Sequence, residues 1–96
     1  MDMDTQATWA FRLFVSGKTA QLDHMFAILK QIFEEHIAGQ YTIEVIDVVK
    51  DPERAAQENI LATPTLLQAY PQPGKRIIGE LTDKEKIVQA LRLEKQ

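Results

Sequence analysis

The stretch "ILATPTLLQAYPQPGKRIIGEL", residues 60–81, decides how the second half of the chain folds. Two short runs rich in apolar residues, at about 65–69 and 75–79, flank a segment that contains Pro71, Pro73 and Gly74. Such runs, joined by a short segment with proline and glycine, are typical of a β-hairpin. Pro64 precedes the first run, where a proline removes no ladder hydrogen bond. The stretch therefore predicts two antiparallel strands that the chain enters through a proline.

Upstream of the hairpin, the pattern predicts a strand, a long helix and a second strand. Residues 9–17 alternate, which puts Phe14 on one strand face and the following residues on the other: Trp9, Phe11, Leu13 and Val15. From Thr19, a good N-cap residue, the apolar period becomes helical and continues to a stop at Gly39. The second strand begins at Tyr41. Its later apolar residues predict a parallel strand buried on both faces: Val45, Ile46, Val48 and Val49.

Capping residues predict two further helices. Asp51 caps a short helix whose first residue is Pro52, and Asn59 closes this helix in a left-handed conformation. The last helix begins with a capping box formed by Thr82 and Glu85. Its predicted buried face consists of Ile87, Ala90 and Leu91.

The predicted order is βαβαββα, an α/β domain over residues 9–93 that follows a flexible tail, residues 1–8. The first two strands are parallel, the hairpin adds two antiparallel strands, and helices cover the mixed four-stranded sheet. This is the order of the minimal thioredoxin-like fold. That fold carries a cis proline before its third core strand, so we expect Thr63–Pro64 to be cis. The alternative is a trans proline that opens an edge strand. In redox members two cysteines begin the first long helix, where this chain has residues 16–19, "SGKT".

Composition excludes several functional classes. The chain has 96 residues, a net charge of −3 and no cysteine. The charge gives no basis for nucleic-acid binding, and the lack of cysteine excludes thiol catalysis, disulfides and cysteine-ligated zinc. No apolar run is long enough to span a membrane, and the acidic, polar N-terminus does not resemble a signal peptide. We therefore expect a cytoplasmic protein without a cofactor.

Individual polar residues give weaker predictions. His24 and His36 are twelve positions apart, about 120° around one helix, so they cannot share a metal ion by themselves. Asp47, in an apolar strand, is either a buried acid or a strand-end residue with a satisfied partner, and the second reading is the commoner one. Lys75 and Arg76 either protect an edge strand or contact a partner, and edge protection is the commoner use.

Four segments resemble the KaiB family, the circadian-clock proteins of cyanobacteria and their relatives in other bacteria. They are "RLFVSGKT" (12–19), "YTIEVIDVVKDPERA" (41–55), "ILATPTL" (60–66) and "KRIIGELTDKEKIV" (75–88). They occur in the family's order and spacing, and the resemblance runs from about residue 9 to residue 93.

The resemblance implies a non-enzymatic regulator that binds the ring-shaped ATPase KaiC, a hexamer, in circadian timing or a related stress response. KaiB proteins dock on the N-terminal ATPase domain of KaiC, displace a sensor histidine kinase and capture KaiA. Positions that are commonly basic in clock members fall on His24, Asn59 and Gln68, so the family's docking contact is weakened here or the partner differs. With Thr63 and Pro64, these three residues form the predicted partner-binding set.

The resemblance also implies that the second half of the chain switches between two folds, a thioredoxin-like monomer and a tetramer with a different second half. Because proline peptide bonds isomerise slowly, Pro64, Pro71 and Pro73 are predicted hinge residues, although Pro71 and Pro73 also suit a stiff hairpin turn. The remaining predicted hinge residues, Ala90 and Arg92, replace a glycine and an aspartate that are frequent in clock members. Together they favour helix by about 1.5–2 kcal/mol. We therefore expect the thioredoxin-like fold at rest, with residues 83–93 helical.

Two alternative functions remain open from the sequence. The chain fits a cysteine-free thioredoxin-like module that binds glutathione or an extended peptide beside Pro64. It also fits a KaiB-like sensor domain of a histidine kinase. In each case an exposed sheet edge suits a homo-oligomer, a dimer or a tetramer.

Overall fold

The fold confirms the predicted order of elements. The structure is a computed structural model that describes residues 9–17, 19–79 and 82–93, so the predicted tail, residues 1–8, lies outside the described residues. The elements are β1 (Trp9–Val15), α1 (Ala20–Ile37), β2 (Tyr41–Asp47), α2 (Pro52–Gln57), β3 (Thr65–Tyr70), β4 (Lys75–Ile78) and α3 (Lys84–Leu91).

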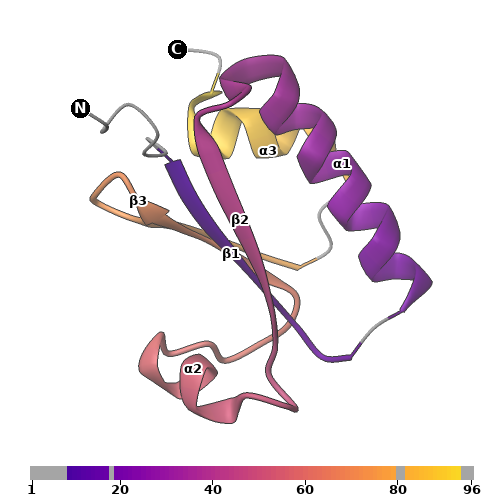
Figure 1. The fold of residues 1–96 in the computed structure, drawn as a ribbon, viewed down its shortest axis with the longest axis vertical. Helices are drawn as coiled ribbons and strands as arrows, with labels where there is room; N and C mark the ends of the chain where they lie inside the picture. Colours follow the sequence, from indigo (N-terminus) through magenta and orange to yellow (C-terminus); the bar gives the residue numbers. More distant parts are fainter. Residues whose placement is uncertain (1–8, 18, 80–81, 94–96) are drawn as a thin grey trace.

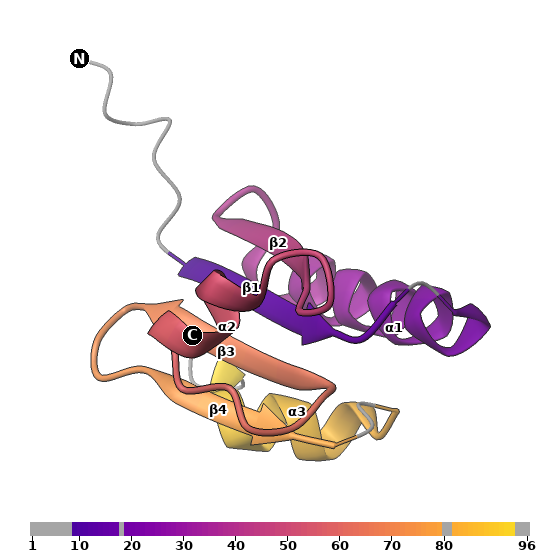
Figure 2. The same ribbon diagram turned by 90° about the horizontal axis from the view of Figure 1, so that it is seen from below.

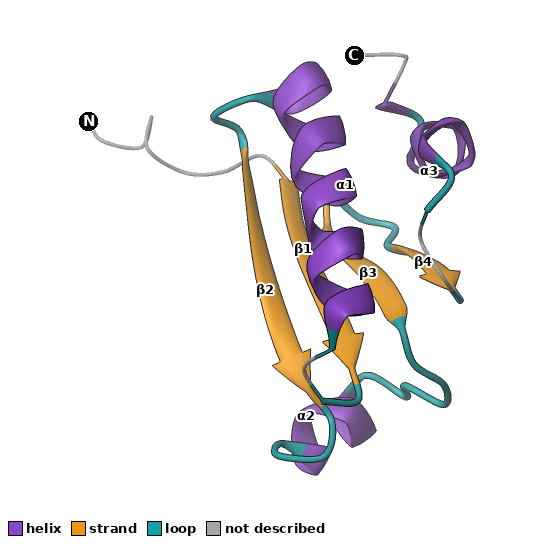
Figure 3. Ribbon diagram, turned by 90° about the vertical axis from the view of Figure 1, so that its right-hand side faces the viewer, coloured by secondary structure: helices purple, strands orange, loops and turns teal. Residues whose placement is uncertain are grey.

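The four strands form one mixed sheet in the order β2-β1-β3-β4. β1 is parallel to β2 and antiparallel to β3, and β3 is antiparallel to β4. Figure 1 shows α1 and α3 on one side of the sheet and α2 on the other. In Figure 3, α1 runs along the strands, whereas α2 lies near their ends. Among the described residues, no helix is long and apolar enough to cross a membrane.

The main core lies between the sheet and the pair α1 and α3. The predicted strand face is confirmed: Trp9 and Phe11 stack at 6.0 Å between ring centroids, and Phe11 stacks on Phe33 of α1 at 4.2 Å. Leu13 of the same face is fully buried. The opposite face carries a smaller cluster whose buried members are Phe14, Ile46 and Leu67. β1 is therefore covered on both sides.

The prediction that β2 is buried on both faces is wrong. β2 is an edge strand, and Val45 is 43% exposed. Val49 lies beyond the end of the strand and is 70% exposed, whereas Ile46 is buried. A run of apolar residues indicates a strand. It does not reveal whether the strand lies at the centre of the sheet, with both faces covered, or at its edge.

The last helix also differs from its prediction. Its N-cap is Asp83, whose Oδ1 accepts a hydrogen bond from the backbone N–H of Lys86 at 3.3 Å, so the predicted capping box at Thr82 is wrong. Ile87 and Leu91 are buried as predicted, but Ala90 is exposed. The helix ends at Leu91, because Arg92 adopts a left-handed conformation with φ 59°. The expected helix over 83–93 is therefore confirmed in its centre and was predicted too long at both ends.

The cap gives a direct test. We expect Asp83→Ala to lower the free energy of unfolding by about 1 kcal/mol, because the Lys86 N–H loses its acceptor. Thr82→Ala is the matched control and should change stability by less than about 0.5 kcal/mol. Urea unfolding monitored by circular dichroism measures both values. If Thr82→Ala lowered the free energy of unfolding more than Asp83→Ala does, Thr82 would be the N-cap, as the sequence predicted.

Candidate functional site

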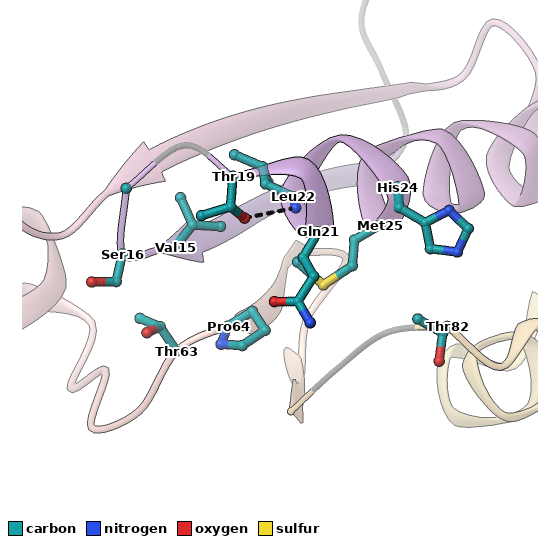
Figure 4. A pocket seen from close by; sticks show the side chains of 11 residues that line it. Val15, Ser16, Thr19, Gln21, Leu22, His24, Met25, Thr63, Pro64 and Thr82 are labelled. Atoms are coloured by element: carbon teal, nitrogen blue, oxygen red, sulfur yellow. Dashed lines mark hydrogen bonds between the residues drawn. The ribbon is translucent and has the colours of Figure 1, made fainter.

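A cavity of about 260 Å³ lies where β1 ends, α1 begins and the chain enters β3. Ser16, Gly17 and Thr19 line it, and they belong to the segment in which the redox members of the expected fold carry two cysteines. Figure 4 shows its lining: Val15, Ser16, Gly17, Thr19, Gln21, Leu22, His24, Met25, Thr63, Pro64 and Thr82. The lining contains no thiol and is largely apolar, so the cavity suits binding rather than redox chemistry.

Local hydrogen bonds fix the first wall of this cavity. The Thr19 hydroxyl accepts from the backbone N–H of Leu22 at 3.1 Å, which confirms the predicted N-cap of α1. Asp47, the last residue of β2, accepts on one carboxylate oxygen from the N–H of Gly17 at 3.2 Å and from that of Val49 at 2.9 Å. Asp47 is thus a satisfied strand-end residue, the commoner of the two predicted readings. It joins the loop before α1 to the turn before α2.

The second wall is the segment that enters β3. The Thr63–Pro64 peptide bond is cis, as expected. The Thr65 hydroxyl donates to the carbonyl of Ala62 at 2.7 Å, and the carbonyl of Pro64 accepts from the N–H of Gly79 at 2.9 Å. The segment is therefore held both by its own turn and by the end of β4.

The structure brings together part of the predicted partner-binding set. His24, Thr63 and Pro64 line the cavity, although the His24 ring points away from Pro64 in Figure 4. Asn59 lies at the C-terminal end of α2, where it adopts the predicted left-handed conformation with φ 57°. Gln68 is 3% exposed, and its Nε2 donates to the carbonyl of Pro71 at 3.0 Å. The Gln68 side chain therefore supports the hairpin turn in this fold and is not presented at the surface.

The predicted hinge residues occupy three separate places, the first of which is Pro64 at the entry to β3. Pro71 and Pro73 lie in the turn between β3 and β4, and the peptide bond before each of them is cis. Ala90 and Arg92 lie at the end of α3. Their role in a change of fold stays a prediction.

The sequence reading missed an apolar surface beside α2. Leu61 is 95% exposed and Val49 is 70% exposed. Leu61 lines a groove of about 280 Å³ together with Val48, Pro52, Ala55, Ile60, Ala62 and Thr63. We call the side chains of Val49, Asn59, Leu61 and Thr63 the α2 surface. Its sequence signal was an apolar Leu61 within a predicted loop, next to two predicted partner-binding residues.

The ionisable side chains do not suggest a metal centre. No group of three or more histidine, aspartate or glutamate side chains lies close enough to hold a metal ion in the ranges 9–17, 19–79 and 82–93. His24 is exposed and His36 is half-buried, at separate positions on α1.

Asp47 provides a test of how the site is held. We expect Asp47→Ala to lower the free energy of unfolding by about 1.5 kcal/mol, because the N–H groups of Gly17 and Val49 lose a charged acceptor. Asp47→Asn keeps an oxygen acceptor and should lose less than half as much. Urea unfolding followed by Trp9 fluorescence measures both. Equal losses of stability in the two variants would assign the effect to the charge of Asp47. Unchanged stability of Asp47→Ala would contradict the role of Asp47 in holding the site.

Comparison with known proteins identifies the family. The KaiB domain matches residues 12–93 of the chain. The circadian clock oscillator protein KaiB of Microcystis aeruginosa is 43% identical over 86 residues, which are 90% of this chain and 83% of that protein. The protein of the same name from Synechococcus elongatus is 42% identical over 91 residues, 95% of this chain and 89% of that protein.

Solved structures with lower identity agree on the fold. The N-terminal domain of Synechococcus elongatus SasA superposes with a TM-score of 0.72 at 22% identity, covering 90% of this chain and 85% of that one. Mitochondrial thioredoxin 3 from Saccharomyces cerevisiae gives a TM-score of 0.69 at 16% identity, with 92% and 80% covered. The architecture is thus thioredoxin-like, and the sequence matches are to clock proteins over almost the whole chain. The chain belongs to the KaiB family.

Proposed function

We propose that this chain is a non-enzymatic regulator of KaiB type that binds a KaiC-like ATPase ring. The observation that carries the proposal is the identity of about 42% to circadian clock oscillator proteins KaiB over at least 90% of the chain. The absence of cysteine from the sequence supports a binding role for the thioredoxin-like fold. The alternatives, a glutathione-binding module and a sensor domain of a histidine kinase, are not favoured by these full-length similarities. KaiA or a sensor kinase would be a further partner of the assembled ring.

The α2 surface is the docking site that we propose for the ring. Leu61 projects from a loop whose two ends are fixed, by the left-handed Asn59 at one end and by the Pro64–Gly79 hydrogen bond at the other. Burial of an exposed leucine side chain contributes about 1.5–3 kcal/mol. An apolar side chain on a preorganised loop loses little conformational entropy on binding. A partner with an apolar pocket for Leu61 therefore gains binding energy there, and the exposed Val49 offers further apolar surface.

Binding to a purified KaiC-type hexamer tests both statements. We expect co-elution of the wild-type chain with the hexamer in size-exclusion chromatography with light scattering, and the run of the free chain gives its oligomeric state. Leu61→Ser should weaken binding by about tenfold or more, because it removes a buried contact worth at least about 1.4 kcal/mol.

Tyr70→Ser is the matched control, since Tyr70 is 55% exposed at the opposite end of β3 from Pro64. This variant should bind as the wild type does. Absence of binding at about tens of micromolar by the wild-type chain would overturn the proposed partner. Equal losses in the two variants would overturn the proposed docking site and leave the partner in place.

A further inference from the structure

Helix α2 contacts the sheet through several charged side chains, and Val48 before it and Ile60 after it pack on the apolar cluster of the sheet. Of its six residues, all of them described, only Ala55 is buried. A helix of six residues is not stable by itself in water, and burial of one alanine contributes little. Contacts with the sheet must therefore hold α2 in place.

The sheet supplies these contacts from one row of residues that crosses all four strands. The register pairs Glu44 of β2 with Arg12 of β1, Arg12 with Leu67 of β3, and Leu67 with Arg76 of β4. The row lies on the face that α2 covers, the face of the Phe14, Ile46 and Leu67 cluster. Figure 2 shows α2 and the segment that follows it on this side of the sheet. Three charged side chains of the row thus face one short helix.

Two ion pairs join the body of α2 to this row. Arg54 donates through both terminal nitrogens to the two carboxylate oxygens of Glu44, at 3.0 and 2.9 Å. Nη1 of Arg12 donates to Glu58, the C-cap of α2, at 2.7 Å, and Nε of Arg12 lies 3.8 Å from Glu44. The hydrogen bond from Arg54 lowers the pKa of the Glu44 carboxyl. The bidentate geometry adds orientation to the attraction.

Arg76 holds the C-terminal end of α2. The helix closes with hydrogen bonds from Asn59 N–H to the carbonyl of Ala56 at 3.1 Å and from Ile60 N–H to that of Ala55 at 2.9 Å. The guanidinium of Arg76 donates to the carbonyl of Asn59 at 3.2 Å and to that of Glu58. A cation at terminal helix carbonyls is favourable. Strand β2 therefore binds Arg54 within α2, whereas β1 and β4 both bind its C-terminal end.

We propose that Arg12, Glu44, Arg54, Glu58 and Arg76 form an ionic clamp that holds α2 closed on the sheet and thereby fixes the α2 surface. The docking consequence, that a closed α2 is needed for binding to the ATPase ring, rests on the proposed function, whereas the clamp itself does not. Salt screens partly exposed ion pairs. Screening therefore opens α2 while the apolar core under α1 stays closed.

Hydrogen–deuterium exchange of the free protein tests the clamp. We expect peptides within residues 48–62 to exchange about two- to fivefold faster in about 0.5 M NaCl than in about 20 mM NaCl, while peptides of α1 are unchanged. Glu44→Gln and Arg54→Gln should each give a similar increase at low salt. Because the two side chains share one interaction, the exchange rate of these peptides in the double variant should be at most about twofold higher than in either single variant.

Glu35→Gln is the matched control. It removes an ion pair of similar exposure, Lys84 to Glu35 at 3.4 Å, which joins α3 to α1. It should leave the exchange of residues 48–62 unchanged. Salt-independent exchange of α2, or Glu44 and Arg54 variants that behave like this control, would overturn the clamp.

Binding to the KaiC-type hexamer tests the docking consequence. Glu44→Arg places a third guanidinium beside Arg12 and Arg54, and Glu44 lies outside the α2 surface. We expect this variant to open α2 strongly in exchange and to bind the hexamer at least about threefold more weakly. If exchange showed that α2 is open in Glu44→Arg and the variant still bound the hexamer as the wild type does, the docking consequence would be overturned. If the wild-type chain does not bind the hexamer at all, the proposed function fails, and the exchange experiment still decides the clamp.

Discussion

The structure depends on the burial of β1 between two strands and two layers. Phe11 stacks on Phe33 on one face, and Phe14 packs with Ile46 and Leu67 on the other. A slip of one residue in this strand would exchange its two faces, so the two clusters together fix the register of the sheet. That register also determines which side chains lie near the cavity and near α2. It places the end of β1 at the wall of the cavity, and it places Arg12 beneath α2.

The two faces of the sheet are stabilised in different ways. The face under α1 and α3 is a continuous apolar core, which includes Leu29, Ile32 and Leu91. The face under α2 has a small apolar cluster and a row of charges. Elements with few buried apolar contacts open at lower cost than the core does. We therefore expect α2 to open more readily than the core under α1 and α3.

Periodicity and capping residues predicted the elements well, because a buried face leaves a regular trace in the sequence. The errors concern the surroundings of single residues. Val45 carries the same apolar signal at an edge as in the centre of a sheet, and Gln68 carries a polar signal although it is buried and bonded to the hairpin turn. The ionic clamp left no local signal in the sequence, since Arg12 and Glu58, for example, are 46 positions apart and come together only in the folded sheet.

The hairpin holds both ends of the segment between α2 and β3, through β4 and the residue that follows it. Arg76 binds the last carbonyls of α2, and the N–H of Gly79 binds the carbonyl of Pro64. Both contacts require β4 to pair with β3 in the observed register, in which Leu67 faces Arg76. If the second half of the chain adopted another fold, as the family resemblance implies, this pairing would be lost together with both contacts. The end of α2 and the loop that carries Leu61 would then lose their support at the same time. The surface proposed for docking is thus a property of the thioredoxin-like fold, because contacts that depend on the pairing of β4 with β3 hold its loop in place.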